Sequence, residues 1–141
     1  MPFATEEELV QSFGQIVNAT RTSLPKMRLC FEFTFMGGRT DIIGVSGVST
    51  VHSFEAKLKR WRDCLHQAYR NTSFSHYSYV LLPEEVVKNA LQEPEEFRKR
   101  GVGLCSFGDG KVRLHIRPQK QFPLQPWLTK RAVATAWGEI S

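Results

Sequence analysis

The fold follows from residues 28–58, which read RLCFEFTFMGGRTDIIGVSGVSTVHSFEAKL. In residues 28–35 every second side chain is apolar, so one face of a predicted strand carries Leu29, Phe31, Phe33 and Phe35. The glycine pair at 37–38 and the segment 46–49 supply turns, so residues 39–45 and 50–58 are predicted as two further strands. We expect a three-stranded antiparallel meander.

Helices and strands are predicted before and after the meander in the sequence, so we expect an α/β domain. Thr5 and Glu8 form a capping box at the start of a helix that ends near Val17. A second helix is predicted from about residue 59 to residue 70, and the apolar residues 76–82 resemble a buried, parallel central strand. Two short helices (84–91 and 95–100) and a hairpin of two strands (102–107 and 112–116) follow.

The expected architecture is a mixed central sheet flanked by helices, with a C-terminal hairpin. We assign residues 1–120 to one domain. Residues 121–141 are predicted to form a tail or short helix that packs on this domain or mediates dimerisation.

Composition narrows the class of protein. The chain has 141 residues, of which 41% are hydrophobic and 23% charged, as in one globular domain. No apolar run approaches the roughly 20 residues of a membrane-spanning helix, and the acidic start lacks a secretory pattern, so we expect a cytoplasmic protein that does not enter membranes. The three cysteines form no CxxC pair and are interpreted as reduced core thiols, and the four histidines lack zinc-site spacing. The net charge of +5 mildly favours a polyanionic partner.

The second and third predicted strands place charged residues opposite one another. In a hairpin whose turn centres on Val48, the numbers of paired residues sum to 96, so Asp41 lies opposite Glu55 and Arg39 opposite Lys57. Opposed residues have Cβ atoms about 4.5–5.5 Å apart, and two unpaired carboxylates at that separation repel each other. A divalent cation such as Mg²⁺, or Mn²⁺ in its place, would relieve the repulsion.

This arrangement has the groups that phosphodiester hydrolysis requires. A cation held by Asp41 and Glu55 can neutralise charge that develops at phosphorus and lower the pKa of a bound water. Lys57, predicted on the same strand face as Glu55, can position or deprotonate the attacking water. We expect four further residues to meet the nucleic acid: Arg39, Lys59, Arg60 and Gln67.

The segments RTDIIG at 39–44 and FEAKL at 54–58 resemble the PD-(D/E)xK nuclease superfamily. Its members include type II restriction enzymes, archaeal Holliday-junction resolvases and RecB-type nucleases. The resemblance implies a restriction-endonuclease-like αβββαβ core and Mg²⁺-dependent endonuclease activity on DNA, with Asp41, Glu55 and Lys57 as catalytic residues. Thr40 stands where the family pattern has a proline. Many members of the family act as dimers, so the resemblance also implies a homodimer. The proline-containing tail from Pro118 to Pro126 is compatible with a further possibility, the catalytic part of a larger DNA-processing complex.

Two further positions bear on the resemblance. Resolvase-like members carry a metal-binding glutamate in the first helix, and Glu6 points along the apolar face of the predicted helix; its other interpretation is stabilisation of the helix dipole. RecB-type members carry QxxxY in the helix after the E-x-K motif, where Gln67 fits the first position and Asn71 replaces the tyrosine.

Two alternatives stay open from sequence. Asp41, Glu55 and Lys57 are also compatible with a cross-strand ion-pair cluster that binds no metal. The whole chain is also compatible with a non-catalytic nucleic-acid-binding or assembly module that keeps the nuclease fold.

Overall fold

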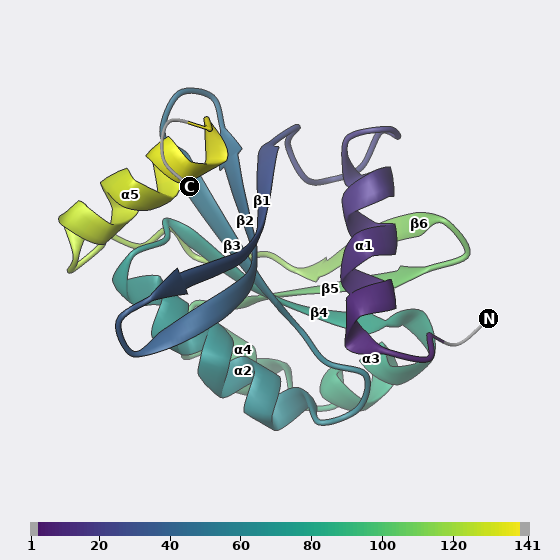
Figure 1. The fold of residues 1–141 in the computed structure, drawn as a ribbon. Coiled ribbons are helices and arrows are strands. Elements are labelled where there is room, and N and C mark those ends of the chain that lie inside the picture. The colour runs from purple at the N-terminus through teal and green to yellow at the C-terminus, as the bar shows by residue number, and fades with distance from the viewer. Residues whose placement is uncertain (1–2, 139–141) are drawn as a thin grey trace.

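The computed structural model describes residues 3–138 of the chain (Figure 1). The first half contains α1 (Glu6–Val17), β1 (Arg28–Phe35), β2 (Gly38–Ser46), β3 (Thr50–Ala56), α2 (Trp61–Arg70) and the short 3₁₀ helix η1 (Asn71–Ser73). The second half contains β4 (Tyr77–Pro83), α3 (Glu84–Ala90), α4 (Pro94–Arg98), β5 (Gly103–Gly108), β6 (Lys111–Ile116) and α5 (Pro126–Ala136).

The six strands form one mixed sheet in the order β1-β2-β3-β4-β5-β6. β1, β2 and β3 form the predicted antiparallel meander. β4 lies parallel to both β3 and β5, and β6 returns antiparallel to β5. The prediction of an α/β fold with a mixed sheet is therefore confirmed, and the apolar run of β4 is a central parallel strand, as its composition predicted.

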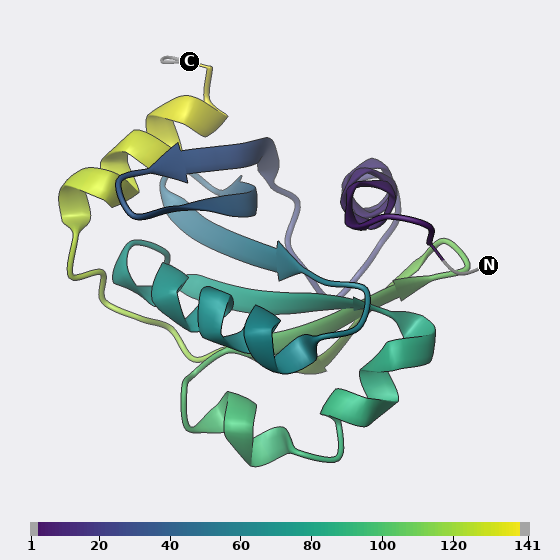
Figure 2. The same cartoon turned by 60° about the horizontal axis from the view of Figure 1, so that its bottom comes forward.

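Helices cover both faces of the sheet (Figure 2). α1 packs on one face, where Leu9, Phe13 and Val17 contact side chains that include Phe54 and Leu81. The other face is covered by α2, α3 and α4, whose apolar side chains surround Val80, Leu82 and Leu104. Alternate residues of β4 thus enter two different cores, which explains why its sequence is apolar throughout.

The predicted capping of α1 is present, but its second hydrogen bond comes from the Ala4 N–H and not from the Thr5 N–H of a capping box. The Thr5 hydroxyl accepts a hydrogen bond from the Glu8 backbone N–H (3.1 Å), and the Glu8 carboxylate accepts one from the Ala4 N–H (3.1 Å). Glu8 is therefore occupied at the helix start, as its position in the sequence predicted.

The predicted single apolar face of β1 is wrong. Glu32 has a φ of +57°, in the left-handed region, which interrupts the alternation in mid-strand. Leu29 borders the core beneath α1, whereas Phe33 belongs to the core beneath α5 and stacks against Phe35. Alternation along a sequence assumes extended backbone at every residue, and one left-handed residue reverses the faces that follow it.

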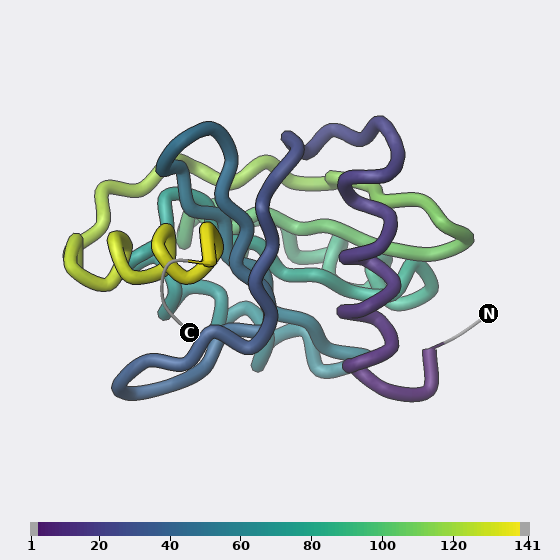
Figure 3. The backbone as a smooth tube through the Cα atoms, turned by 45° about the horizontal axis from the view of Figure 1, so that its top comes forward, coloured from purple at the N-terminus to yellow at the C-terminus, as the bar shows by residue number. Residues whose placement is uncertain are grey.

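α5 covers part of the sheet near β2 and β3. Its Leu128 and Ala132 are buried against Ile43, Val45 and Val51 of β2 and β3. Figure 3 shows α1 and α5 on either side of β1. None of the helices within residues 3–138 is long and apolar enough to cross a membrane.

Candidate active site

The β2–β3 hairpin has the register predicted from its turn. Ile42 pairs with Phe54 and Val45 with Val51, so the paired numbers sum to 96. Asp41 and Glu55 follow directly at the end of this ladder. One Asp41 carboxylate oxygen (Oδ2) accepts a hydrogen bond from the Ala56 backbone N–H at 2.8 Å, which holds Asp41 against β3. The two carboxyl groups therefore meet where the strands separate.

Glu55 is an acidic side chain enclosed by protein. Its side chain is only 3% exposed. The Asn71 side-chain amide donates a hydrogen bond to Glu55 Oε2 at 2.7 Å, and an Arg70 guanidinium nitrogen lies 3.7 Å from the same oxygen. Asn71 also accepts a hydrogen bond from the Thr40 hydroxyl at 2.9 Å, so one buried amide joins β2, β3 and the end of α2. Glu55 is consequently fixed in position.

The pair is electrostatically strained. Burial and the adjacent negative charge of Asp41 raise the pKa of Glu55 to about 8, against the opposing effects of Asn71 and Arg70. Without a cation, Glu55 is therefore mainly protonated at neutral pH. A divalent cation that replaced this proton would neutralise both carboxylates at once, which is the electrostatic condition for a metal-binding pair.

A pocket of about 270 Å³ lies beside Asp41. Residues of α1, including Glu6 and Val10, line one side, and Arg39 and Glu32 line the other. Arg39 and Glu32 are exposed and form an ion pair at 3.5 Å. The structure thus brings Glu6 to one pocket with Arg39 and Asp41, although Glu6 is remote from both in sequence.

Lys57 lies just beyond β3, which ends at Ala56 rather than at the predicted residue 58. Its backbone N–H donates to the Leu81 carbonyl at 3.3 Å, and its side chain is half-buried. The predicted pairing of Arg39 with Lys57 is wrong, because the paired residues of β2 and β3 end at Ile42 and Phe54 and Lys57 lies beyond β3. The hairpin diverges at this point, since β3 continues along β4 while β2 turns towards β1.

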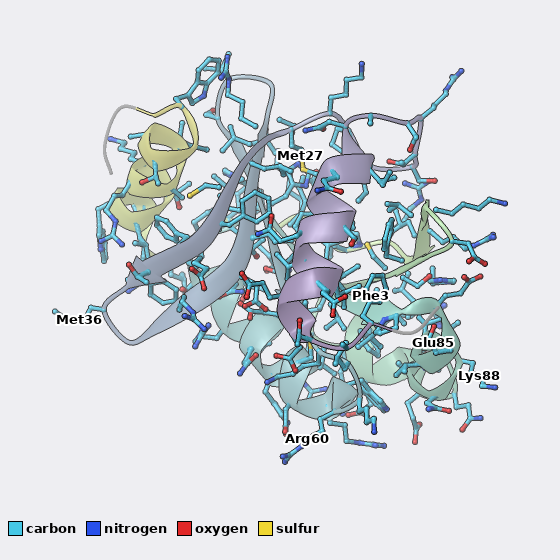
Figure 4. All side chains as sticks on the ribbon, turned by 45° about the vertical axis from the view of Figure 1, so that its right-hand side comes forward. Phe3, Met27, Met36, Arg60, Glu85 and Lys88 are labelled. Atoms are coloured by element: carbon cyan, nitrogen blue, oxygen red, sulfur yellow. The ribbon has the colours of Figure 1, made fainter. Side chains whose placement is uncertain are left out.

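The basic residues at the start of α2 lie away from this pocket. Lys59 and Arg60 are exposed, and Arg60 pairs with Asp63 of its own helix at 2.8 Å. Figure 4 shows Arg60 projecting from the molecule into solvent. Gln67 is half-buried in α2, one turn before Asn71. None of these three residues lines the pocket that Asp41 and Glu6 share.

The side chains considered as metal ligands are the carboxylates of Asp41 and Glu55. Within residues 3–138, no group of three or more His, Cys, Asp or Glu side chains is arranged to hold a metal ion. Glu6 shares a pocket with Asp41 but does not complete such a group. Two carboxylates still suit Mg²⁺, which keeps several water ligands and is commonly held by one or two carboxylates together with substrate phosphate. The Mg²⁺ ion stays a prediction, for which Asp41 and Glu55 supply the carboxylate pair.

Asn71 and Arg70 are the site residues that the sequence analysis did not identify. Asn71 was noted only as a departure from the QxxxY pattern. The helical spacing of α2 could have identified it. Trp61, Cys64 and Ala68 lie on the buried face of the helix, and the same spacing places residue 71, which is polar, on that face. A fully buried amide requires a partner, and here that partner is Glu55.

Comparisons with known proteins bear on the fold. No family model matches the chain, and no curated protein matches it. Among solved structures, it is similar to the SPO1766 protein of unknown function from Silicibacter pomeroyi, with a TM-score of 0.70 and 14% sequence identity. The match covers 99% of this chain and 90% of that one. At this identity the similarity shows a shared fold alone.

Proposed function

We propose that this protein is a Mg²⁺-dependent endonuclease of the PD-(D/E)xK type that hydrolyses phosphodiester bonds in DNA. The observation that carries the proposal is the Asp41–Glu55 pair, two carboxyl groups that meet at the end of the β2–β3 ladder with the Glu55 side chain only 3% exposed. A buried, mutually repelling pair is costly for a purely structural role, whereas it suits a site that exchanges a proton for a cation.

The order of elements supports the same proposal. α1, β1, β2, β3, α2 and β4 follow one another as in a restriction-endonuclease-like core, with the acidic pair at the end of the β2–β3 ladder. The net charge of +5 favours a polyanionic substrate such as DNA.

Each residue has a role in this proposal. Asp41 and Glu55 would hold the ion, which supplies charge neutralisation at the phosphate and an acidified water. Asn71 and Arg70 orient the Glu55 carboxylate, because both contact the same oxygen. Lys57 places a positive charge next to Glu55 in the chain and would stabilise negative charge that develops during cleavage. Arg39, at the mouth of the pocket, is available to a neighbouring phosphate oxygen.

Cleavage assays test the proposal. The native chain is incubated with supercoiled plasmid, linear duplex, a four-way junction, a flap and a single strand, each with Mg²⁺, Mn²⁺ or EDTA. We expect metal-dependent cutting that is lost in Glu55→Gln and Lys57→Ala. The matched controls Glu85→Gln and Lys88→Ala change the same charges on exposed residues of α3 and should cut normally (Figure 4). The substrate that is preferred would identify the class of nuclease.

The second candidate is a non-catalytic nucleic-acid-binding or assembly module. It is favoured by one observation, namely that Glu55 Oε2 is already engaged by Asn71 and Arg70. A module of this kind would cut none of the substrates with either metal. It would also retain salt-sensitive DNA binding in both site variants. Such a result would replace the endonuclease proposal.

A further inference from the structure

A second pocket, of about 380 Å³, lies at the other end of β3 from the carboxyl pair. Ser46 of β2, His52 of β3, and Tyr77 and Tyr79 of β4 contribute to its walls. The loop at 23–25 and Arg117, which follows β6, complete it. Its volume lies within the range of pockets that hold small organic ligands. The pocket shares no residue with the one beside Asp41.

Flat aromatic rings form a rigid wall of this pocket. The rings of His52 and Tyr77 are stacked, with centroids 5.2 Å apart and planes inclined by 22°, and Tyr79 lies on the same stack at 5.8 Å and 19° from His52. His52 is held at both ring nitrogens, by the Ser46 hydroxyl at 2.9 Å and the Tyr79 hydroxyl at 3.0 Å. His52 and Tyr79 are each only 3% exposed, so the half-buried ring of Tyr77 is the aromatic surface that a ligand can reach. Its stacking on His52 keeps this ring ordered, which suits a planar ligand.

The charge of the pocket favours an anion. Arg117 is the lone charged side chain among the residues that line it, and no carboxylate does so. Arg117 is exposed and forms no ion pair with any Asp or Glu of residues 3–138. Arg117 lines the same pocket as Tyr77 and Tyr79. His52 adds no competing charge, since burial and the nearby His76 lower its pKa to about 4.

Hydroxyl groups supply additional hydrogen-bonding capacity. Ser23, Thr50 and Tyr77 line the pocket, and the Tyr77 hydroxyl makes no hydrogen bond to the described part of the chain. Hydroxyls can donate to an anion or pair with the polar edge of a ring. The pocket therefore combines an ordered aromatic ring, one cation without an ion pair and unused donors.

We infer that this pocket binds a planar aromatic ring that carries an anionic group, the chemistry shared by a free mononucleotide and by one nucleotide of a single strand. The ring stacks on Tyr77, and the phosphate lies against Arg117. This inference goes beyond the proposed function, because it requires neither the carboxyl pair nor a metal ion.

Titration calorimetry on the full chain in EDTA tests the inference, because EDTA separates this pocket from any metal-dependent step. The probes are deoxyadenosine 5′-monophosphate, deoxyadenosine, inorganic phosphate and a short oligodeoxynucleotide. We expect the monophosphate to bind more tightly than the nucleoside or phosphate alone. Arg117→Gln should weaken binding about tenfold, and Tyr77→Leu about fivefold or more. Arg113→Gln, an exposed change on β6, is the matched control and should have no effect.

Binding of both the monophosphate and the oligonucleotide with this dependence on Arg117 and Tyr77 supports a free-nucleotide site. Binding of the oligonucleotide alone, with the same dependence, supports a strand site. The inference is overturned if neither probe binds, if Arg117→Gln binds as tightly as the native chain, or if inorganic phosphate binds as tightly as the monophosphate. Arg117 is exposed, so its variant should fold and its result decides the matter even if Tyr77→Leu is unstable.

Discussion

Replacing Glu55 by glutamine should make the protein more stable at alkaline pH while it removes the proposed activity. Glutamine has almost the same shape and keeps a carbonyl oxygen that can accept the hydrogen bond from Asn71. It removes a carboxyl group whose charging is opposed by burial and by Asp41. A site built for function rather than stability should respond in this way.

The sign and size of the effect follow from proton linkage. The folded chain holds the Glu55 proton with a pKa raised from 4.5 to about 8, so it binds this proton more tightly than the unfolded chain does. The resulting stabilisation is complete below pH 4.5 and is lost as the pH rises towards 8. At 1.36 kcal/mol per pKa unit, the limit is about 5 kcal/mol. Between pH 5 and pH 8 we expect the chain to lose about 2 kcal/mol of this stabilisation.

Urea unfolding at pH 5 and pH 8 measures this effect. The native chain and Glu55→Gln should have similar free energies of unfolding at pH 5, and the variant should be about 2 kcal/mol more stable at pH 8. Glu85→Gln on α3 provides the control, since its carboxylate is exposed and its loss should not alter the pH dependence. If the native chain and Glu55→Gln lose stability equally between the two pH values, the strained carboxyl pair does not exist.

Three other changes test neighbouring parts of the account. Asn71→Ala should lower the free energy of unfolding in urea by about 1–3 kcal/mol, because it leaves the buried Thr40 hydroxyl and Glu55 without their hydrogen-bond partner. An unchanged free energy would contradict these contacts. Asp41→Asn should lower the pKa of Glu55 towards 4.5, because the charge of Asp41 helps to raise this pKa. Carboxyl ¹³C NMR measures it, and a pKa that stays near 8 would assign the shift to burial alone. Glu32→Gly should raise the urea midpoint of unfolding by an amount equivalent to about 1 kcal/mol, because glycine tolerates the φ of +57°. A lower midpoint would show that the Glu32–Arg39 ion pair contributes more than the backbone strain costs.

Local pattern was enough to predict most of the elements. The alternation in residues 28–35 gave the bounds of β1, and the turn at Val48 gave the register that brings Asp41 beside Glu55. The apolar run at 76–82 indicated a strand buried on both faces, because only a central strand can place all its side chains in cores. These features depend on residues that are close together in the chain, so they can be predicted from the sequence.

The remaining features depend on contacts between distant segments. The left-handed backbone of Glu32 could not be predicted, because glutamate rarely adopts it and the surrounding alternation indicates an extended strand. The place of Lys57 beyond β3 follows from the divergence of β2 and β3, which is a property of the assembled sheet. The pocket that joins Glu6 to Asp41 requires the packing angle of α1, which helical periodicity does not determine.

The central claim is that Asp41 and Glu55 together bind a divalent cation, and titration of the native chain with Mn²⁺ tests it without knowledge of the substrate. Calorimetry at pH 7 in two buffers of different ionisation enthalpy should show one ion bound and about one proton released, because the ion displaces the Glu55 proton. Asp41→Asn should abolish the binding, and Glu85→Gln should leave it intact. Absence of Mn²⁺ binding by the native chain, or equal binding by Asp41→Asn, would contradict the account.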